Sequence, residues 1–268
     1  KFLFNFSAMI WIWKHQHEFD LVVEDINKIP FLTPLYVKRK RLHMVMHFFK
    51  GSIYKETNIL FATYVYLMER MVSLFYKKDA FIAISESTKK DIEHFGIHGR
   101  QISIVEPGID TTYFYPTVEK STPPILSYIG RLMKYKNVQF IINALPELRR
   151  RVPGIIFEAA GSGDYLEELK KTARKAGVED CVIFPGRISE QQKRDLLSRS
   201  TIFVNPSSKE GWGINNIEAN LCGTISISNN VEGLRDSVLD GVTGLLYEPE
   251  NIIDFCDKAE SVLVDVRK

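Results

Sequence analysis

Short apolar runs separated by stretches with helical spacing make up most of the second half of this chain. The apolar runs fall at 125–129, 155–160, 182–184, 202–204, 224–228 and 245–247. Between them, apolar residues recur every three or four positions at 138–151, 165–176, 190–199 and 215–221. That spacing is typical of amphipathic helices. Strands that alternate with helices favour βαβ units, and nearly continuous apolar strands indicate a parallel sheet covered on both faces. The pattern predicts a doubly wound α/β domain.

The first half has the same alternation with fewer strands. Apolar runs occur at 21–24, 43–47, 81–85 and 102–105, with a long helical pattern at 54–78. Ser85 has the sequence context of a helix N-cap. The turn-rich stretch that follows, up to Pro124, indicates a linker. We therefore predict two Rossmann-like doubly wound domains, at residues 1–115 and 116–268.

The first domain is expected to be incomplete. The chain begins at Lys1 without an initiator Met, and its opening residues resemble a helix entered midway. They lack the small-residue cleavage site of a signal peptide. An intact first domain would be about as large as the second, so we expect its opening part to be missing.

Composition narrows the class of protein. Apolar residues make up 45% and charged residues 25% of the 268 positions, which is the balance of a globular protein. A net charge of +2 does not favour nucleic acid as a partner. The longest apolar runs are too short for a membrane-spanning helix. Three widely spaced cysteines predict neither a disulfide framework nor a zinc site, and they suit a reducing, cytoplasmic compartment.

Candidate ligand-binding residues follow the strands of the second domain, because ligands of such folds bind beyond the carboxyl ends of the strands. Gly130 allows a sharp turn after the first strand, and Arg131 and Lys136 then lie on the loop that precedes a helix. Two cations at this edge suit a diphosphate, since Arg can grip two oxygens and Lys supplies a point charge. Spacing alone allows them equally to be solvated surface cations.

The next two loops are less specific. Gly161 and Gly163 resemble the start of a dinucleotide fingerprint, but Leu166 stands where the third glycine belongs. This disfavours a nicotinamide oxidoreductase and leaves a tight turn that a ligand could approach. Gly186 and Arg187 follow the third strand, where they could read a base edge or form a plain turn with a surface arginine.

Residues 205–219 carry the strongest local signal. Gly211 and Gly213 free the backbone just before a helix, whose N-terminal N–H groups favour an anion. Glu210 precedes this helix, and Glu218 lies about one turn inside it. Ionised carboxylates accept strong hydrogen bonds, so the two could hold sugar hydroxyls. The alternative is a pair of acids that only complements the helix dipole.

This segment resembles the E-x7-E motif of retaining glycosyltransferases with the GT-B fold, a large family that includes sucrose-phosphate synthases and many mannosyltransferases. The segments at 130–136, 220–224, 233–236 and 241–246 resemble further parts of the same pattern. The resemblance implies that Arg131 and Lys136 bind the donor diphosphate, Glu210 the donor sugar, and Glu218 the ribose. The backbone from Gly211 through Trp212 and Gly213 to Ile214 would lie along the sugar and phosphates. Departures at Trp212, Asn215, Asn216 and Glu232 put the choice of sugar in doubt.

The first domain resembles the acceptor half of that family more loosely, at 23–25, 30–35 and the strand expected to end at His47. His47 would then face the cleft near the reacting sugar, although a histidine beside Phe48 and Phe49 is often only a packed residue. Ser85 could also face the cleft. The family's glycine-rich loop after the first strand is absent from this chain.

The resemblance implies a retaining hexosyltransferase that uses a UDP- or GDP-sugar as co-substrate and needs no cofactor. No Asp-x-Asp pair is evident, so we expect no essential metal. The acceptor would be a glycan, a lipid or a small molecule. Two alternatives remain: a non-catalytic sugar-nucleotide-binding subunit, and another enzyme on the same fold, such as a sugar-nucleotide epimerase or a glycan phosphorylase.

A basic run at 38–41 and the pair at 77–78 adjoin aromatic sequence. Such patches can bind anionic membrane surfaces, which would suit peripheral contact with the cytoplasmic membrane face and a lipid-linked acceptor. A charge run of this kind is more often a solvated face.

Overall fold

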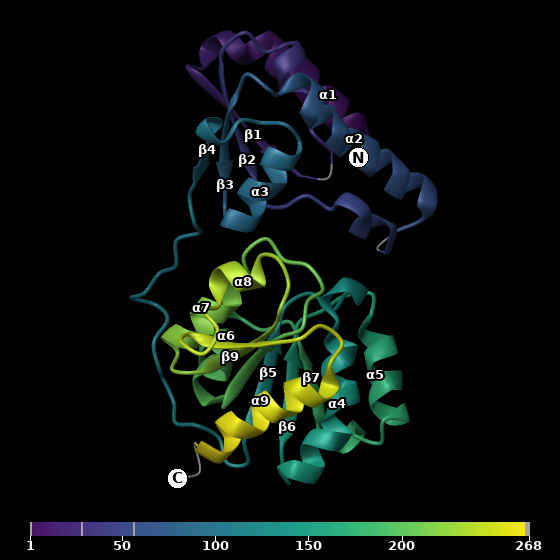
Figure 1. Ribbon diagram of the computed structural model, residues 1–268, viewed down its shortest axis with the longest axis vertical. Helices are drawn as coiled ribbons and strands as arrows, with labels where there is room; N and C mark the ends of the chain where they lie inside the picture. Colours follow the sequence, from purple (N-terminus) through teal and green to yellow (C-terminus); the bar gives the residue numbers. More distant parts are fainter. Residues whose placement is uncertain (1, 28, 56, 266–268) are drawn as a thin grey trace. The chain divides into compact units, whose positions relative to one another are not determined.

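The computed structural model describes residues 2–27, 29–55 and 57–265, and it divides into two compact units at Pro107/Gly108 (Figure 1). This division precedes the 115/116 boundary drawn from the sequence. Phe114 lies in an apolar cluster with Leu197 and Phe203 of the second unit, with Tyr113 packed against it. The turn-rich segment is therefore attached to the second unit by its aromatic residues.

Unit 1 is a parallel four-stranded sheet with helices. Its strands, in the spatial order β1-β2-β3-β4, are β1 Leu21–Ile26, β2 Lys40–Val45, β3 Ala80–Ala83 and β4 Ile102–Ile104. Its α-helices are α1 Phe2–His15, α2 Ile59–Phe75 and α3 Glu86–His94, and its short 3₁₀ turns are η1 Gln16–Glu18, η2 Thr33–Leu35, η3 Lys50–Lys55 and η4 Gly99–Gln101. The core of this unit gathers large side chains such as Phe48, Tyr76 and Phe81.

Two expectations for unit 1 need correction. The long helical pattern at 54–78 forms a helix only from Ile59, because the side chain of Asn58 caps it by accepting a hydrogen bond from Phe61 N at 2.9 Å. The second strand ends at Val45, so His47 lies in the following loop and is not a strand terminus. Ser85 does cap α3, accepting from Thr88 N at 3.1 Å.

Unit 2 contains a parallel six-stranded sheet in the order β10-β9-β8-β5-β6-β7. The strands are β5 Ile125–Ile129, β6 Ile156–Ala160, β7 Val182–Gly186, β8 Ile202–Asn205, β9 Ile225–Asn229 and β10 Gly244–Tyr247. Its helices and 3₁₀ turns are η5 Lys134–Lys136, α4 Val138–Arg151, α5 Leu166–Lys175, η6 Glu179–Cys181, α6 Glu190–Arg199, α7 Ile214–Leu221, α8 Leu234–Ser237 and α9 Ile252–Asp265.

The order in which the chain connects the strands of unit 2 indicates where on its sheet a ligand would bind. From β5 the chain proceeds outward through β6 to β7, and it then returns to β8 on the other side of β5. The switch point, where the strand order reverses, therefore lies between β5 and β8, and ligands of such folds bind at the carboxyl ends of the strands. Helix α4 packs on α5 and α9, while α6 packs on α7 (Figure 1). The central strands are buried along their length, so the predicted doubly wound α/β class is confirmed.

Candidate functional site

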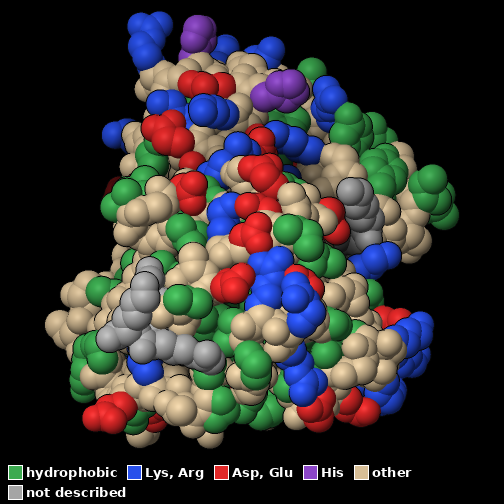
Figure 2. Space-filling view, turned by 60° about the horizontal axis from the view of Figure 1, so that its bottom comes forward, with side chains coloured by type: hydrophobic (Ala, Val, Ile, Leu, Met, Phe, Trp, Pro, Cys, Tyr) green, Lys and Arg blue, Asp and Glu red, His purple; other side chains and the backbone are tan. Residues whose placement is uncertain are grey.

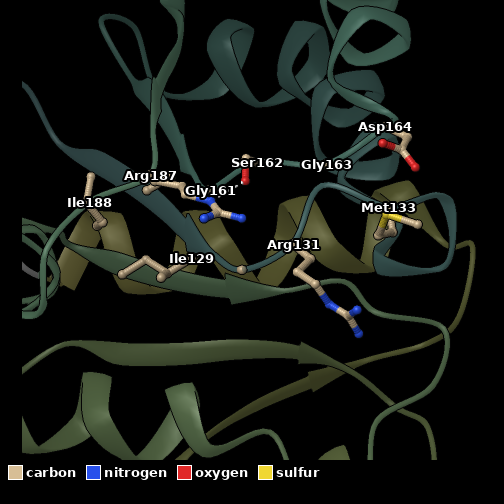
Figure 3. A pocket seen from close by; sticks show the side chains of 11 residues that line it. Ile129, Arg131, Met133, Gly161, Ser162, Gly163, Asp164, Arg187 and Ile188 are labelled. Atoms are coloured by element: carbon tan, nitrogen blue, oxygen red, sulfur yellow. Dashed lines mark hydrogen bonds between the residues drawn. The ribbon is translucent and has the colours of Figure 1, made fainter. Parts of the chain in front are cut away.

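A pocket of about 710 Å³ opens at the carboxyl ends of β5, β6 and β7 (Figure 3). Its lining includes five residues predicted from the sequence: Gly130, Arg131, Gly161, Gly163 and Arg187. It also includes six residues that the prediction did not name as ligand contacts: Ile129, Met133, Ala160, Ser162, Asp164 and Ile188. Each of these six residues ends a strand or lies within three residues of a predicted site residue. Their position at or just after a strand, and not their residue type, is therefore the feature of the sequence that could have identified them.

Two glycines allow the loops around this pocket to pack backbone to backbone. A Cβ atom at Gly161 would lie 1.8 Å from the carbonyl oxygen of Gly130, and one at Gly163 would lie 2.1 Å from that of Leu132. The backbone of Leu132 also donates to Ser162 O at 3.0 Å and accepts from Tyr165 N at 3.1 Å. The β5 and β6 loops are thus tied together, and only glycine fits at the two contacts.

The two arginines of the pocket lie apart from one another. The Nε of Arg187 donates to the hydroxyl of Ser162 at 2.9 Å, so this guanidinium lies near Gly161 (Figure 3). Arg131 extends away from it, and its Nη2 donates to Tyr135 Oη at 2.8 Å. Both side chains are exposed, which leaves further N–H groups of each guanidinium for an anionic ligand.

Lys136 and Glu210 meet next to this pocket. Lys136 Nζ forms a close ion pair with Glu210 Oε1, which also accepts from Ser207 Oγ at 2.9 Å. The backbone of Ser208 donates to Tyr135 O at 2.9 Å, so the loops after β5 and β8 are joined at this point. The ammonium and the carboxylate are each less than a fifth exposed. Lys136, which is predicted to bind the diphosphate, and Glu210, which is predicted to bind the sugar, therefore lie side by side where the loops after β5 and β8 meet.

The start of α7 is fixed against the end of β5. Gly213 adopts a φ of 81°, a left-handed conformation that favours glycine. The side chain of Asn215 then donates to Ile129 O at 2.7 Å, which brings the helix N-terminus to the pocket rim. Trp212 is buried, and its Nε1 has no partner within the described residues. The first N–H groups of α7 thus lie beside a pocket that carries arginines.

Glu218 lies one turn further along α7 and is 5% exposed. Its Oε2 lies 2.6 Å from Nζ of Lys193, which projects from α6. Sequence reasoning did not find Lys193, because nothing in the spacing relates a residue of α6 to one of α7.

In unit 1 the structure places two histidines in different surroundings. His47 is half-buried, and its ring lies 4.6 Å from that of Phe49. His43, which sequence reasoning did not single out, is fully buried in β2. Its Nε2 lies 2.9 Å from Asp79 Oδ2 and its Nδ1 lies 3.5 Å from Glu24 Oε2.

This buried network continues to further polar groups. Arg41 donates to both carboxylate oxygens of Asp79, at 2.8 and 2.7 Å, while Tyr76 Oη donates to Glu24 at 2.9 Å. Burial acts to raise the pKa of Asp79, but the bonds from Arg41 and His43 outweigh it and hold that pKa below its ordinary value. Burial likewise opposes ionisation of Glu24, whose pKa is nevertheless lowered by its hydrogen bonds from His43 and Thr33.

Charge is not segregated on the surface that Figure 2 shows, where acidic and basic side chains are interspersed. Within the described residues no three His, Cys, Asp or Glu side chains gather closely enough to hold a metal ion. No helix in residues 2–27, 29–55 and 57–265 is long and apolar enough to cross a membrane.

Comparison with known proteins identifies the class. Residues 110–268 match the family "Glycosyl transferases group 1", and residues 1–113 match "Glycosyltransferase Family 4". The first match alone covers more than half of the chain, so this chain belongs to the group 1 glycosyltransferases. The family predicted from the E-x7-E motif is therefore confirmed.

Two curated relatives illustrate the range of this family. A glycogen synthase of Mycobacterium tuberculosis is 33% identical over 192 residues, which cover 70% of this chain and 46% of the relative. A GDP-mannose-dependent alpha-(1-6)-phosphatidylinositol monomannoside mannosyltransferase of Mycolicibacterium smegmatis is 30% identical over 179 residues, covering 60% of this chain and 47% of the relative. The matched part of this chain thus spans about half the length of these relatives.

Solved structures share the fold at low identity. Anabaena HepE, crystallised with UDP and glucose, superposes with a TM-score of 0.77 at 18% identity, covering 97% of this chain and 73% of that one. Sucrose-phosphate synthase from Thermosynechococcus elongatus also gives 0.77, at 20% identity, covering 98% and 68%. These likenesses support the GT-B fold class, with two Rossmann-like units.

Proposed function

We propose that this protein is a retaining hexosyltransferase that takes its sugar from a UDP- or GDP-linked donor and needs no metal ion. The observation that carries the proposal is the junction of the β5 and β8 loops. There Lys136 pairs with Glu210 beside a pocket that Arg131 lines. A cation for a diphosphate and an acid for a sugar are what a nucleotide-sugar donor requires in adjacent positions.

The chemistry would be electrostatic. The bond between the anomeric carbon and the diphosphate oxygen breaks while negative charge collects on the diphosphate. Arg131, Lys136 and the first N–H groups of α7 would stabilise that charge. Glu210, released from Lys136 as the ammonium turns to the phosphate, would accept hydrogen bonds from the sugar. The backbone of residues 211–214 would lie along the sugar and phosphates.

Retention follows if the acceptor attacks from the face that the leaving group vacates. The acceptor hydroxyl oxygen forms the new bond to the anomeric carbon, and its proton passes to a phosphate oxygen of the departing diphosphate. Glu218 would bind the ribose hydroxyls. Gly186 and Arg187 would lie next to the nucleobase of the donor. His47 of unit 1 is proposed to approach the reacting sugar.

Donor binding tests the proposal directly. Thermal-shift measurements with UDP, GDP and ADP sugars should raise the melting temperature with one base in preference to the others, since a ligand that binds only the folded state stabilises it. Replacement of Arg131 or Lys136 by alanine should reduce both this shift and turnover sharply. Lys134→Ala is the matched control, because Lys134 lies in the same 3₁₀ turn as Lys136 but is exposed. Near-normal turnover in the Arg131 and Lys136 variants would refute their diphosphate role.

The stereochemistry and the two alternative functions are separable by product analysis. NMR of the transferred sugar should show the anomeric configuration of the donor. A non-catalytic subunit would bind the donor without releasing free nucleoside diphosphate in the presence of any acceptor. An epimerase would change the free sugar nucleotide itself.

We also propose that unit 1 contacts an anionic membrane face on the cytoplasmic side, where a lipid-linked acceptor would be available. Trp11 and Trp13 of α1 are more than half exposed. The loop after α1 holds the basic segment, because Lys38 N donates to Gln16 Oε1 at 2.6 Å and Arg39 Nη2 donates to His17 O at 3.1 Å. Amphipathic aromatic rings beside cations suit a lipid headgroup boundary.

Arg41 limits the size of this basic segment, since it pairs with Asp79 and is only 21% exposed. Lys38, Arg39 and Lys40 are the exposed members of the run. The protein should sediment with vesicles that contain anionic lipid at low salt and be released at high salt. The double variant Lys38→Ser/Arg39→Ser should sediment less. Equal sedimentation with neutral vesicles would contradict the electrostatic contact.

A further inference from the structure

The ammonium of Lys193 is held inside unit 2 against the acid that the family resemblance assigns to the ribose. Its side chain is 13% exposed and that of Glu218 is 7% exposed, with 2.6 Å between Nζ and Oε2. The same ammonium lies 5.4 Å from the centre of the Phe114 ring and 3.9 Å from Glu190 Oε2. Lys193 therefore has an aromatic face and two carboxylates around it, of which Glu218 is the nearer and the more buried.

The helix that carries Lys193 is itself well fixed at this point. Ser189 and Gln192 form a capping box at the start of α6, with hydrogen bonds of 3.2 and 2.8 Å. Lys193 N then donates to Ser189 O at 2.8 Å in the first turn. A lysine side chain normally loses much rotational freedom when it is immobilised, but here the ring of Phe114 and the rigid first turn restrict it in advance.

The geometry points to Lys193 as a positioning residue for nucleotide recognition: it holds one oxygen of Glu218 so that the other oxygen is directed to the ribose hydroxyls. Among the described residues Lys193 is the only side chain that forms an ion pair with Glu218, and the approach of its ammonium to Oε2 lacks the alignment of a hydrogen bond. A nearly buried carboxylate that loses its cation is no longer held in one orientation and can turn toward water. Because Lys193 fixes the position of one carboxylate oxygen, the other oxygen keeps one orientation toward a ligand.

Because Glu218 contacts a ribose only if the chain binds a nucleotide sugar, the role of Lys193 depends on the proposed function. The two can fail separately. Donor binding as a whole depends mostly on the diphosphate and the base, whereas Lys193 should affect only the part of the affinity that comes from the ribose hydroxyls.

The test compares nucleotides that differ only at the ribose or only at the phosphate. Calorimetric dissociation constants are measured for UDP and GDP, for their 2′,3′-dideoxy forms, and for UMP and GMP. The proteins are the unmodified chain, Lys193→Met, Lys193→Arg and Lys171→Met. The last is a matched control, since Lys171 on α5 pairs with Glu168 at 3.3 Å on the surface.

The unmodified chain and Lys171→Met should prefer the ribose form of the bound nucleotide by about tenfold, which corresponds to one charge-assisted hydrogen bond. In Lys193→Met that preference should shrink to about twofold. The preference for diphosphate over monophosphate should stay unchanged, which a general loss of structure would not allow. Lys193→Arg should restore most of the ribose preference because it restores the positive charge.

Removal of one member of a buried ion pair can prevent folding, so a second variant is needed. The double variant Lys193→Met/Glu218→Gln removes both charges of this ion pair, and its ribose preference should equal that of Glu218→Gln alone. A full ribose preference in Lys193→Met, or a further loss in the double variant, would overturn the positioning role. If the unmodified chain shows no ribose preference, the role fails while the donor function stands. If it binds neither UDP nor GDP, both fail.

Discussion

The steric contact at Gly163 gives a prediction whose size can be worked out from the structure. In Gly163→Ala the added Cβ would lie 2.1 Å from Leu132 O and 2.7 Å from Leu132 C. Real Cβ atoms do not approach backbone this closely, and a carbonyl cannot rotate away as a flexible side chain can. The loops after β5 and β6 must therefore separate by about an ångström, which strains the hydrogen bonds that Leu132 makes to both sides.

Overpacking of this kind costs about 2 kcal/mol of unfolding free energy. For a unit the size of residues 108–268, each kcal/mol lowers the melting temperature by about 2–4 °C, so a decrease of about 4–8 °C is expected. Since Gly163 and Arg131 line the same pocket, affinity for UDP or GDP should fall as well, by about tenfold if one diphosphate contact is lost.

Differential scanning fluorimetry and calorimetric titration would measure both effects. Gly108→Ala is the matched control, because a Cβ at Gly108 meets no atom within 4 Å. It should melt within about 1 °C of the unmodified chain and bind nucleotide equally well. If Gly163→Ala matched this control in both measurements, the close packing of the two loops would be refuted as a determinant of the pocket.

Three further predictions concern acid stability, a buried ion pair and metal. The lowered pKa of Asp79 means that its contribution to folding is present above the ordinary pKa of 3.8 and is lost as the pH falls through the folded-state value. Asp79→Asn should therefore be less stable at pH 7 and lose less stability on acidification, and urea unfolding curves that shift in parallel for both proteins would contradict this. Arg199 donates to both oxygens of the buried Glu158, at 2.8 and 2.7 Å. Arg199→Ala should lower the unfolding free energy by about 2 kcal/mol, against less than about 1 kcal/mol for the exposed Arg150→Ala in the same denaturant assay. EDTA should leave sugar transfer unchanged, whereas a loss that Mg²⁺ or Mn²⁺ reverses would show that metal takes part.

The local predictions that succeeded share one physical basis. The strand at 125–129 and the helices at 138–151 and 190–199 have the bounds expected from their apolar spacing. In each case the apolar spacing within a segment indicates which of its own residues are buried, so the bounds of the element follow from the local sequence. Helix α9 was not anticipated, although residues 252–265 have apolar positions that bury against α4. The helix predicted at 54–78 was too long, because aromatic residues continue the helical spacing on the N-terminal side of Asn58, which caps the helix.

The sequence predicted several of the residues that form the candidate site, but it did not predict which of them contact one another. The sequence pointed to cations after β5 and to acids around α7, because residues after parallel strands reach the same edge of the sheet. It could not indicate that Lys136 pairs with Glu210, or that Asn215 fastens α7 to the end of β5. Such contacts join segments more than seventy residues apart, and they depend on the order of strands in the sheet.

What the sequence alone determined is the set of elements, their α/β class and the family to which the chain belongs, since periodicity and motif spacing are properties of neighbouring residues. Tertiary structure alone decided which distant side chains became partners. Parallel pairing places Glu24 opposite His43, and the packing of α6 on α7 brings Lys193 to Glu218. The energy of a buried charge depends on what surrounds it in three dimensions, and the linear order of residues does not contain that information.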